Sequence, residues 1–75
     1  MTMTHVAAIG ERRRVIGLAT AGVVVLPAED PDAVLAAWSG LPAEVGLVIL
    51  TPAAAAALGS GPLDAQEPLT AVMPS

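Results

Sequence analysis

The sequence predicts an α/β domain built on a small, open sheet of four parallel strands. Short apolar runs alternate along the chain with segments whose apolar residues recur at helical spacing. The apolar runs are continuous, as is typical of parallel strands that are buried on both faces. Each run is followed by a glycine, a proline or a helix-capping residue, and these residues commonly mark the ends of short elements.

The first apolar run, over residues 6–9, predicts a strand that ends at Gly10. We interpret Gly10 as turn geometry, because glycine is the default residue in tight turns. A helix is expected to follow and to stop at Gly22, a typical C-terminal glycine. The residues expected on neighbouring faces of this helix are Val15, Ile16, Ala19 and Thr20.

The second strand is predicted over residues 23–26 and is closed by Pro27. A second helix is expected to begin with Asp30 as N-cap and Pro31 at the first helical position. Its apolar stripe includes Trp38, the only large aromatic residue of the chain, which we expect in the core or at an interface. The full stripe is Val34, Leu35, Trp38 and Leu41.

The second half of the chain repeats this pattern. A third strand is predicted over residues 45–50, in the centre of the sheet because this run is the most apolar and β-branched. Thr51-Pro52 is a second cap-plus-proline pair and begins a short helix over 53–58. The composition of 59–62 predicts a loop, and a polar segment then leads to a last strand over 69–73.

These elements predict one domain over residues 1–75 with a structured core over 5–74. Right-handed crossovers favour the strand order 2-1-3-4, with one helix on one face of the sheet and two on the other. The resulting topology is Rossmann-like or receiver-like.

Composition excludes several classes of function. The chain of 75 residues has no cysteine, so neither disulfides nor thiolate metal sites are expected. Its single histidine, His5, has no second histidine or cysteine with which to share a metal. A net charge of −4 with three clustered cations argues against binding to nucleic acid. The apolar runs are too short to span a bilayer, so no membrane insertion is expected.

The sequence also predicts no catalytic site, cofactor or small-molecule ligand. Gly10, Gly17 and Gly22 do not have the Gly-x-Gly-x-x-Gly spacing of a dinucleotide-binding turn, and no Gly-Lys-Ser/Thr motif is present. Three carboxylates that could resemble a catalytic pair are assigned instead to capping of the second helix. These are Glu29, Asp30 and Asp32.

The chemically distinctive residues follow the first strand. Arg12, Arg13 and Arg14 are the only cations of the chain, and they stand where a helix N-terminus disfavours positive charge. Arginine is enriched at protein interfaces and pairs well with carboxylates. We therefore expect Glu11 and the three arginines to be candidates for contact with a protein partner, with a solvated helix start as the alternative.

Several motifs together resemble the F subunit of the V-type (also called A-type) ATP synthases. Members of that family typically open with a strand ending in Gly-Asp or a close variant, here Gly10-Glu11, and continue to a Gly-Phe-x-Leu-Ala-Gly helix end. The second motif reads Gly17-Leu-Ala-Thr-Ala-Gly22, with leucine for the usual phenylalanine and threonine where leucine is common. The resemblance continues over three further segments, Glu29-Asp30-Pro31, Gly46 to Thr51, and Pro68 to Ser75.

The resemblance implies a non-catalytic role in the central stalk. Members of this family dock on the coiled-coil rotor subunit (the D subunit) and turn with it as ATP turnover is coupled to ion (proton) transport. The implied location is cytoplasmic and peripheral to the membrane, within a membrane-associated complex with other V-type ATPase subunits. Family members usually continue into a C-terminal helix linked to regulation of ATP hydrolysis, and the sequence stops at Ser75 before such a helix.

Two other functions remain open at the level of sequence. A receiver-like signalling or interaction domain would share the strand order, but it needs an aspartate after the third strand and a lysine further on. The chain has Leu50-Thr51 at that place and no lysine. A small nucleotide-binding enzyme fragment is disfavoured by the missing phosphate loop.

Overall fold

The structure, a computed structural model, describes residues 5–59 and 69–74. Four strands form one open sheet in the order β2-β1-β3-β4, and each neighbouring pair is parallel. The predicted α/β fold class and strand order are therefore confirmed. Of the predicted loop and the polar segment after it, residues 60–68 lie outside the described residues. The strands are β1 (His5–Gly10), β2 (Val24–Pro27), β3 (Val45–Leu50) and β4 (Leu69–Val72).

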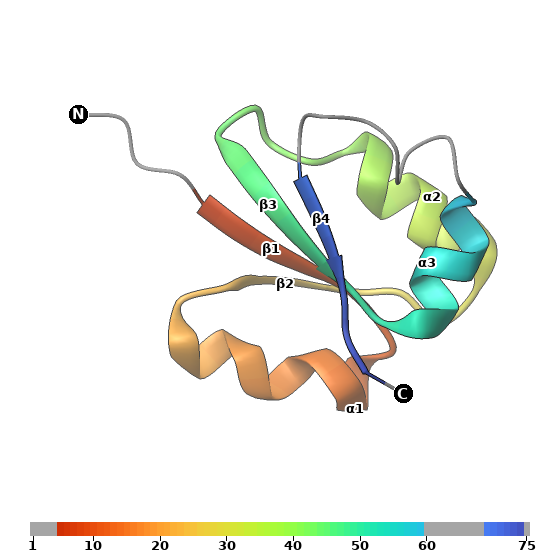
Figure 1. Ribbon diagram of the computed structural model, residues 1–75, viewed down its shortest axis with the longest axis horizontal. Coiled ribbons are helices and arrows are strands. Elements are labelled where there is room, and N and C mark those ends of the chain that lie inside the picture. Colours follow the sequence, from red (N-terminus) through yellow and green to blue (C-terminus); the bar gives the residue numbers. More distant parts are fainter. Residues whose placement is uncertain (1–4, 60–68, 75) are drawn as a thin grey trace.

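Helical segments lie on both faces of the sheet (Figure 1). A short α1 (Arg12–Val15) continues into the 3-10 helix η1 (Ile16–Ala21), and both pack against β1 and β2. On the other face, α2 (Pro31–Ser39) and α3 (Pro52–Leu58) pack against each other and against the central strands. The expected division into one helical segment on one face and two on the other is correct.

The first helical segment differs from the predicted helix. Only its first turn is α-helical, and the six residues after it form a 3-10 helix with three residues per turn. Val15 is fully buried and Leu18, three residues later, is half-buried, whereas Ile16 is 45% exposed. The segment contains Gly17 and Thr20, two weak helix formers, and the Thr20 hydroxyl donates to the Gly17 carbonyl at 2.9 Å. The predicted continuous α-helix up to Gly22 is therefore wrong after Val15.

The ends of the other helical elements follow the predicted rules. Asp30 accepts a hydrogen bond from the Ala33 amide at 2.8 Å, and Pro31 occupies the first turn of α2. Thr51 has the same role before α3, where its hydroxyl oxygen accepts from the Ala54 amide at 3.3 Å. Gly22 ends η1 with φ of 82°, the left-handed conformation that glycine tolerates best.

The main core lies between the sheet and the α2–α3 layer. Side chains alternate between the two faces of each strand, so Ile9 of β1 and Leu50 of β3 share this core. On the opposite face, Ala8 and Val15 are fully buried where α1 covers β1. Within the described ranges no helix has the length and hydropathy needed to cross a membrane. The buried members of the main core are Ala7, Ile9, Ala28, Val34, Val45, Val48, Leu50, Ala54, Ala55 and Leu58.

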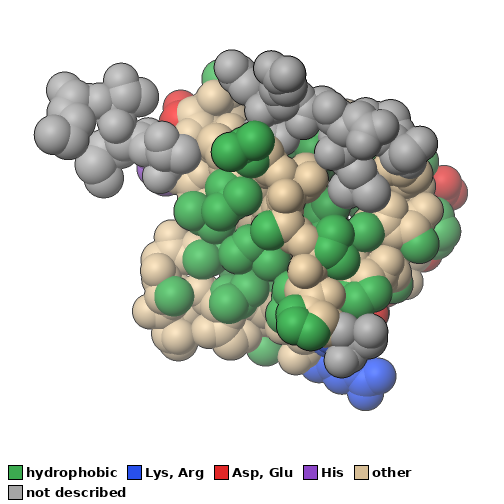
Figure 2. All heavy atoms as spheres, in the orientation of Figure 1, with side chains coloured by type: hydrophobic (Ala, Val, Ile, Leu, Met, Phe, Trp, Pro, Cys, Tyr) green, Lys and Arg blue, Asp and Glu red, His purple; other side chains and the backbone are tan. Residues whose placement is uncertain are grey.

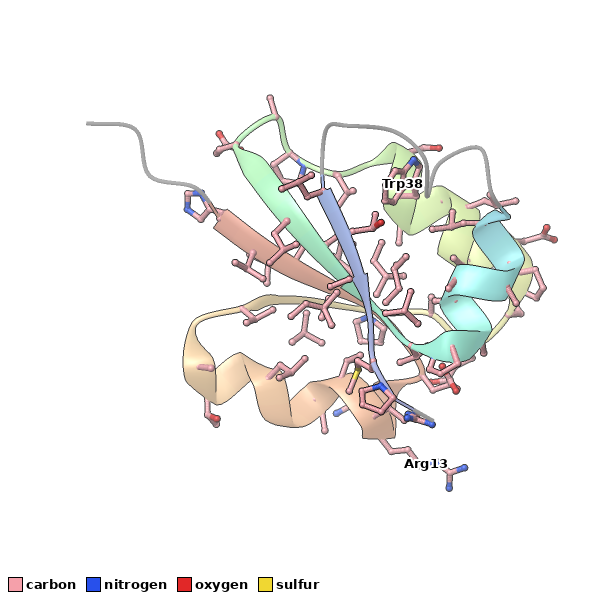
Figure 3. All side chains as sticks on the ribbon, in the orientation of Figure 1. Arg13 and Trp38 are labelled. Carbon is pink, nitrogen blue, oxygen red and sulfur yellow. The ribbon has the colours of Figure 1, made fainter. Side chains whose placement is uncertain are left out.

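The predicted apolar stripe of α2 is only partly directed inward. Val34 is buried, and Trp38 and Leu41 are half-buried against the main core, but Leu35 is 44% exposed. Trp38 lies in the last turn of α2 (Figure 3). The indole therefore closes the rim of the core rather than filling its centre.

Replacing Trp38 by alanine is expected to lower the free energy of unfolding by about 3 kcal/mol, the low end of the range for large aromatic truncations, because the indole is half-buried. Urea denaturation measures this change. Leu35→Ala on the same helix is the control and should cost less than about 1 kcal/mol, since Leu35 is exposed. Equal losses in the two variants would contradict the assignment of Trp38 to the core rim.

Candidate functional site

The carboxyl ends of β1 and β3 meet at the point where the strand order reverses. The chain leaves β1 at Gly10-Glu11 and leaves β3 at Thr51, and the two strands are neighbours in the sheet. Open α/β sheets usually bind ligands in the crevice at such a switch point. This edge is therefore the first place to look for a functional site.

Thr51 fills this crevice with protein contacts. Its side chain is fully buried, and its hydroxyl donates to Glu11 Oε1 at 2.6 Å while accepting from the Ala54 amide. The Thr51 backbone amide donates to the Ile9 carbonyl at 3.2 Å. Every hydrogen-bonding group that Thr51 directs toward β1 and α3 is thus already engaged.

Glu11 is held in its ionised form. The hydrogen bond from Thr51 is the main cause that lowers the pKa of Glu11 below its usual value of 4.5. A backbone hydrogen bond within Glu11 and the charges of Arg14 and Arg13 act in the same direction, and burial opposes them. At neutral pH this carboxylate accepts hydrogen bonds, so it has no proton to give to a substrate.

Gly10 is required by the close approach of Thr51. A Cβ atom built at Gly10 would lie only 2.8 Å from the Cβ of Thr51, closer than non-bonded carbon atoms approach. Gly10 has no positive φ; the positive-φ glycines in the described ranges are Gly22 and Gly59. The interpretation of Gly10 as turn geometry is therefore wrong, and the reason for the glycine is steric.

A small cavity opens beside this contact, between the carboxyl edge of the sheet and the α2–α3 layer. Its volume is about 110 Å³, well below the roughly 300–1,000 Å³ of typical small-molecule sites. A shallower hollow of about 470 Å³ lies on the α1 side of Glu11 and is lined by Glu11, Arg12, Arg13, Ile16 and Glu29. No group of three or more His, Cys, Asp and Glu residues in the described ranges is arranged to hold a metal ion. The cavity is lined by Glu11, Ala28, Glu29, Asp30, Pro31, Val34, Ala53, Ala54 and Ala57.

Glu29 has a different role from the one expected. Its carboxylate accepts a hydrogen bond at 2.8 Å from the backbone amide of Arg12, at the start of α1. Glu29 therefore caps the helix that precedes it by 17 residues, while Asp30 caps α2 as predicted. This negative charge offsets the three arginines in the first turn of α1.

The four predicted interface residues are brought to one corner of the molecule, but they are not equally free. Glu11 is bound to Thr51, and the Arg14 guanidinium donates to the Pro74 carbonyl at 2.9 Å, just beyond β4. Arg13 extends away from the body of the protein (Figure 3). The side chains of Arg12 and Arg13 are exposed and form no hydrogen bond with another described residue.

Sequence reasoning missed Thr51 as the link between the two strands, although it identified Thr51 as a helix cap. A usable signal was present, because the predicted strand order already placed Gly10 and Thr51 at neighbouring strand ends. The contact of Arg14 with Pro74 joins residues 60 positions apart and has no local signature.

Comparison of the chain with protein-family models, curated proteins and solved structures found no match. The assignment of function therefore depends on the residues and the geometry of the chain itself.

Gly10→Ala is expected to lower the free energy of unfolding by about 1–3 kcal/mol, the usual cost of overpacking, because the new methyl group meets Thr51. Gly17→Ala is a matched control, since its added Cβ has no neighbour within 4 Å beyond the adjacent residues and the backbone of its own helical segment, and it should be neutral or slightly stabilising. Denaturant unfolding of both variants tests the contact. Equal stability of Gly10→Ala and the wild type would show that the strands do not approach so closely.

Removal of the Glu11 charge is expected to change the response to acid. Because the pKa of Glu11 is lowered in the folded state, its contribution to stability is present above the unfolded pKa of about 4.5 and is lost as pH falls through the folded pKa. Glu11→Gln should therefore flatten the fall in unfolding free energy below about pH 4.5.

Thr51→Ser keeps the hydroxyl group and is the control that should retain the wild-type pH dependence. Urea titrations over a series of pH values measure both variants. A Glu11→Gln curve parallel to that of the wild type at acid pH would contradict the role of the Thr51 hydrogen bond.

Proposed function

We propose that this domain is a non-catalytic assembly component of a rotary ATPase, equivalent to the F subunit of the V-type enzymes. It docks on the coiled-coil rotor subunit of that complex and supports the coupling of ATP turnover to ion transport. In such a complex the domain is peripheral to the membrane on its cytoplasmic side.

The observation that carries the non-catalytic assignment is the hydrogen bond between Thr51 and Glu11. It engages the two side chains that stand at the switch point, where a domain of this topology would bind a substrate or cofactor. The adjacent carboxylates are also engaged, Glu29 by the Arg12 amide and Asp30 by the Ala33 amide. What is left at this corner is a charged, exposed surface of Arg12 and Arg13, which suits a protein partner.

The rotor assignment rests on the family-like motifs, which coincide with element boundaries. Gly10-Glu11 ends β1, Gly22 ends η1 in the left-handed conformation, and Glu29-Asp30 precedes α2. The segment from Gly46 to Thr51 runs from the second residue of β3 to the cap of α3. Most of these motifs therefore lie at the ends of strands and helices. This position is expected if the chain shares the architecture of that family.

The proposal predicts that the domain binds the coiled-coil rotor subunit of a V-type ATPase encoded in the same genome. Size-exclusion chromatography of the mixed proteins should give a complex in which one domain is bound to each rotor subunit, and the domain alone should not hydrolyse ATP. An unrelated coiled coil of similar length and charge is the control and should not bind. A folded domain that fails to bind the rotor subunit, or that hydrolyses ATP by itself, would overturn the proposal.

A further inference from the structure

One half of one sheet face is not covered by the helical segments within residues 5–59 and 69–74. On the α1 side, α1 and η1 pack against β1 and β2, while the β3–β4 half remains accessible, with Leu69 61% exposed. Strand alternation and the β3–β4 register place four side chains together on this half. We call it the open sheet face, formed by Leu47, Ile49, Leu69 and Ala71.

The open sheet face is apolar throughout. None of its four residues carries a charge or a hydrogen-bonding side chain, and hydrophobic side chains gather over the strands between α1 and β4 (Figure 2). Ile16 of η1, 45% exposed, adds a further apolar side chain on the α1 side. Single exposed apolar residues are common on protein surfaces, but a contiguous apolar patch marks an interaction site.

The kind of cover that fits this face follows from the sheet. Purely parallel sheets are covered on both faces by helices, and such helices begin at the carboxyl ends of the strands. β3 has six residues and therefore spans roughly 20 Å, the length of a helix of about 13 residues. A single amphipathic helix of this length would cover the open sheet face.

Charge marks one end of the open sheet face. Arg14 reaches the Pro74 carbonyl beyond the carboxyl end of β4, and Arg13 stands next to it on α1. With Arg12 these are all the arginine and lysine residues of the chain. The neighbouring carboxylates of Glu11 and Glu29 accept hydrogen bonds within the protein, whereas the Arg13 side chain is exposed. A covering helix that begins here has its N-terminus beside the arginines, and carboxylates are favoured both by the helix dipole and by the guanidinium groups.

We propose that the open sheet face binds one amphipathic helix of a partner protein, with an apolar stripe on Leu47, Ile49 and Leu69 and with acidic residues of its first turn against Arg13 and Arg14. This inference rests on the proposed function, since a coiled-coil rotor subunit presents helices. Beyond the proposed function, the inference specifies which face of the domain binds, in which direction the partner helix runs, and which charge its N-terminus carries.

The test uses a synthetic, monomeric 14-residue helical peptide with a leucine stripe and two glutamates in its first turn. A second peptide has lysines in place of the two glutamates. In NMR titrations the acidic peptide should shift the amide signals of β3, β4 and α1, and the lysine peptide should bind at least about 10-fold more weakly. Binding of the acidic peptide weaker than about 1 mM, or equal binding of the two peptides, would overturn the inference.

Matched variants locate the binding face. Leu69→Glu should weaken binding of the acidic peptide at least about 10-fold, while Leu35→Glu, at an exposed leucine on the α2 side, should leave it unchanged. Ala71→Glu is a second variant on the open sheet face if Leu69→Glu does not fold, as judged by circular dichroism. Equal effects of the Leu69 and Leu35 variants would overturn the inference.

The role of charge is tested separately. Arg13→Ala should weaken peptide binding about 3- to 10-fold at low salt and less at high salt, because screening removes the attraction. Ala43→Glu changes the net charge by the same amount at an exposed loop position and should have a smaller effect. Identical effects of the two variants would show that only net charge matters and would overturn the assignment of Arg13.

Two further outcomes separate this inference from the proposed function. If Leu69→Glu and Ala71→Glu bind the rotor subunit no less tightly than the wild type binds it, the rotor proposal stands and the open sheet face is not the docking surface. If the domain binds the peptide on this face but not the rotor subunit, the rotor proposal fails and the helix-binding face stands.

A dimer in sedimentation equilibrium that Leu69→Glu dissociates would identify a second copy as the occupant and overturn the inference.

Discussion

The carboxyl ends of β1 and β3 are joined by Thr51, and the arrangement of the rest of the molecule depends on this residue. Its backbone amide continues the β1–β3 ladder to Ile9, and its hydroxyl donates to Glu11 and accepts from the first turn of α3. The side chain also occupies the space that a Cβ at residue 10 would need. One buried threonine thus caps the start of α3, lowers the pKa of Glu11 and accounts for the glycine at the end of β1.

The closed crevice has consequences for the charges around it. Because Glu11 is turned toward Thr51, the start of α1 takes its capping carboxylate from Glu29, which reaches across from the segment after β2. Glu29 binds the backbone amide of Arg12 and leaves the Arg12 guanidinium exposed. Arg14 turns toward the end of β4. Glu11, Glu29 and the arginines therefore lie together at this corner, where both carboxylates are hydrogen-bonded within the protein and the side chains of Arg12 and Arg13 are exposed.

Sequence reasoning succeeded where a feature is local or follows from chain connectivity. The bounds of β3 are as predicted, because a β-branched apolar run is closed by Thr51-Pro52, and the strand order follows from the crossover rules. It failed where two competing local structures differ little in energy, as in the 3-10 segment after Val15. It also failed where long-range contacts choose a partner, since Glu29 fits the start of α2 as well as that of α1 until the fold brings it to the Arg12 amide.

The uncovered half of the sheet follows from the topology of the described elements. In the order β2-β1-β3-β4, the connections from β2 to β3 and from β3 to β4 carry α2 and α3, and both pack on the same face. Among the described elements, only α1 and η1, which connect β1 to β2, pack on the other face, and they cover its β1–β2 half. The position of this connection over β1 and β2 is fixed by the strand order, so α1 and η1 do not reach β3 and β4. The proposed partner helix would bury Leu69, which is 61% exposed, together with the half-buried Leu47 and Ile49, and a domain of this size gains stability from such burial.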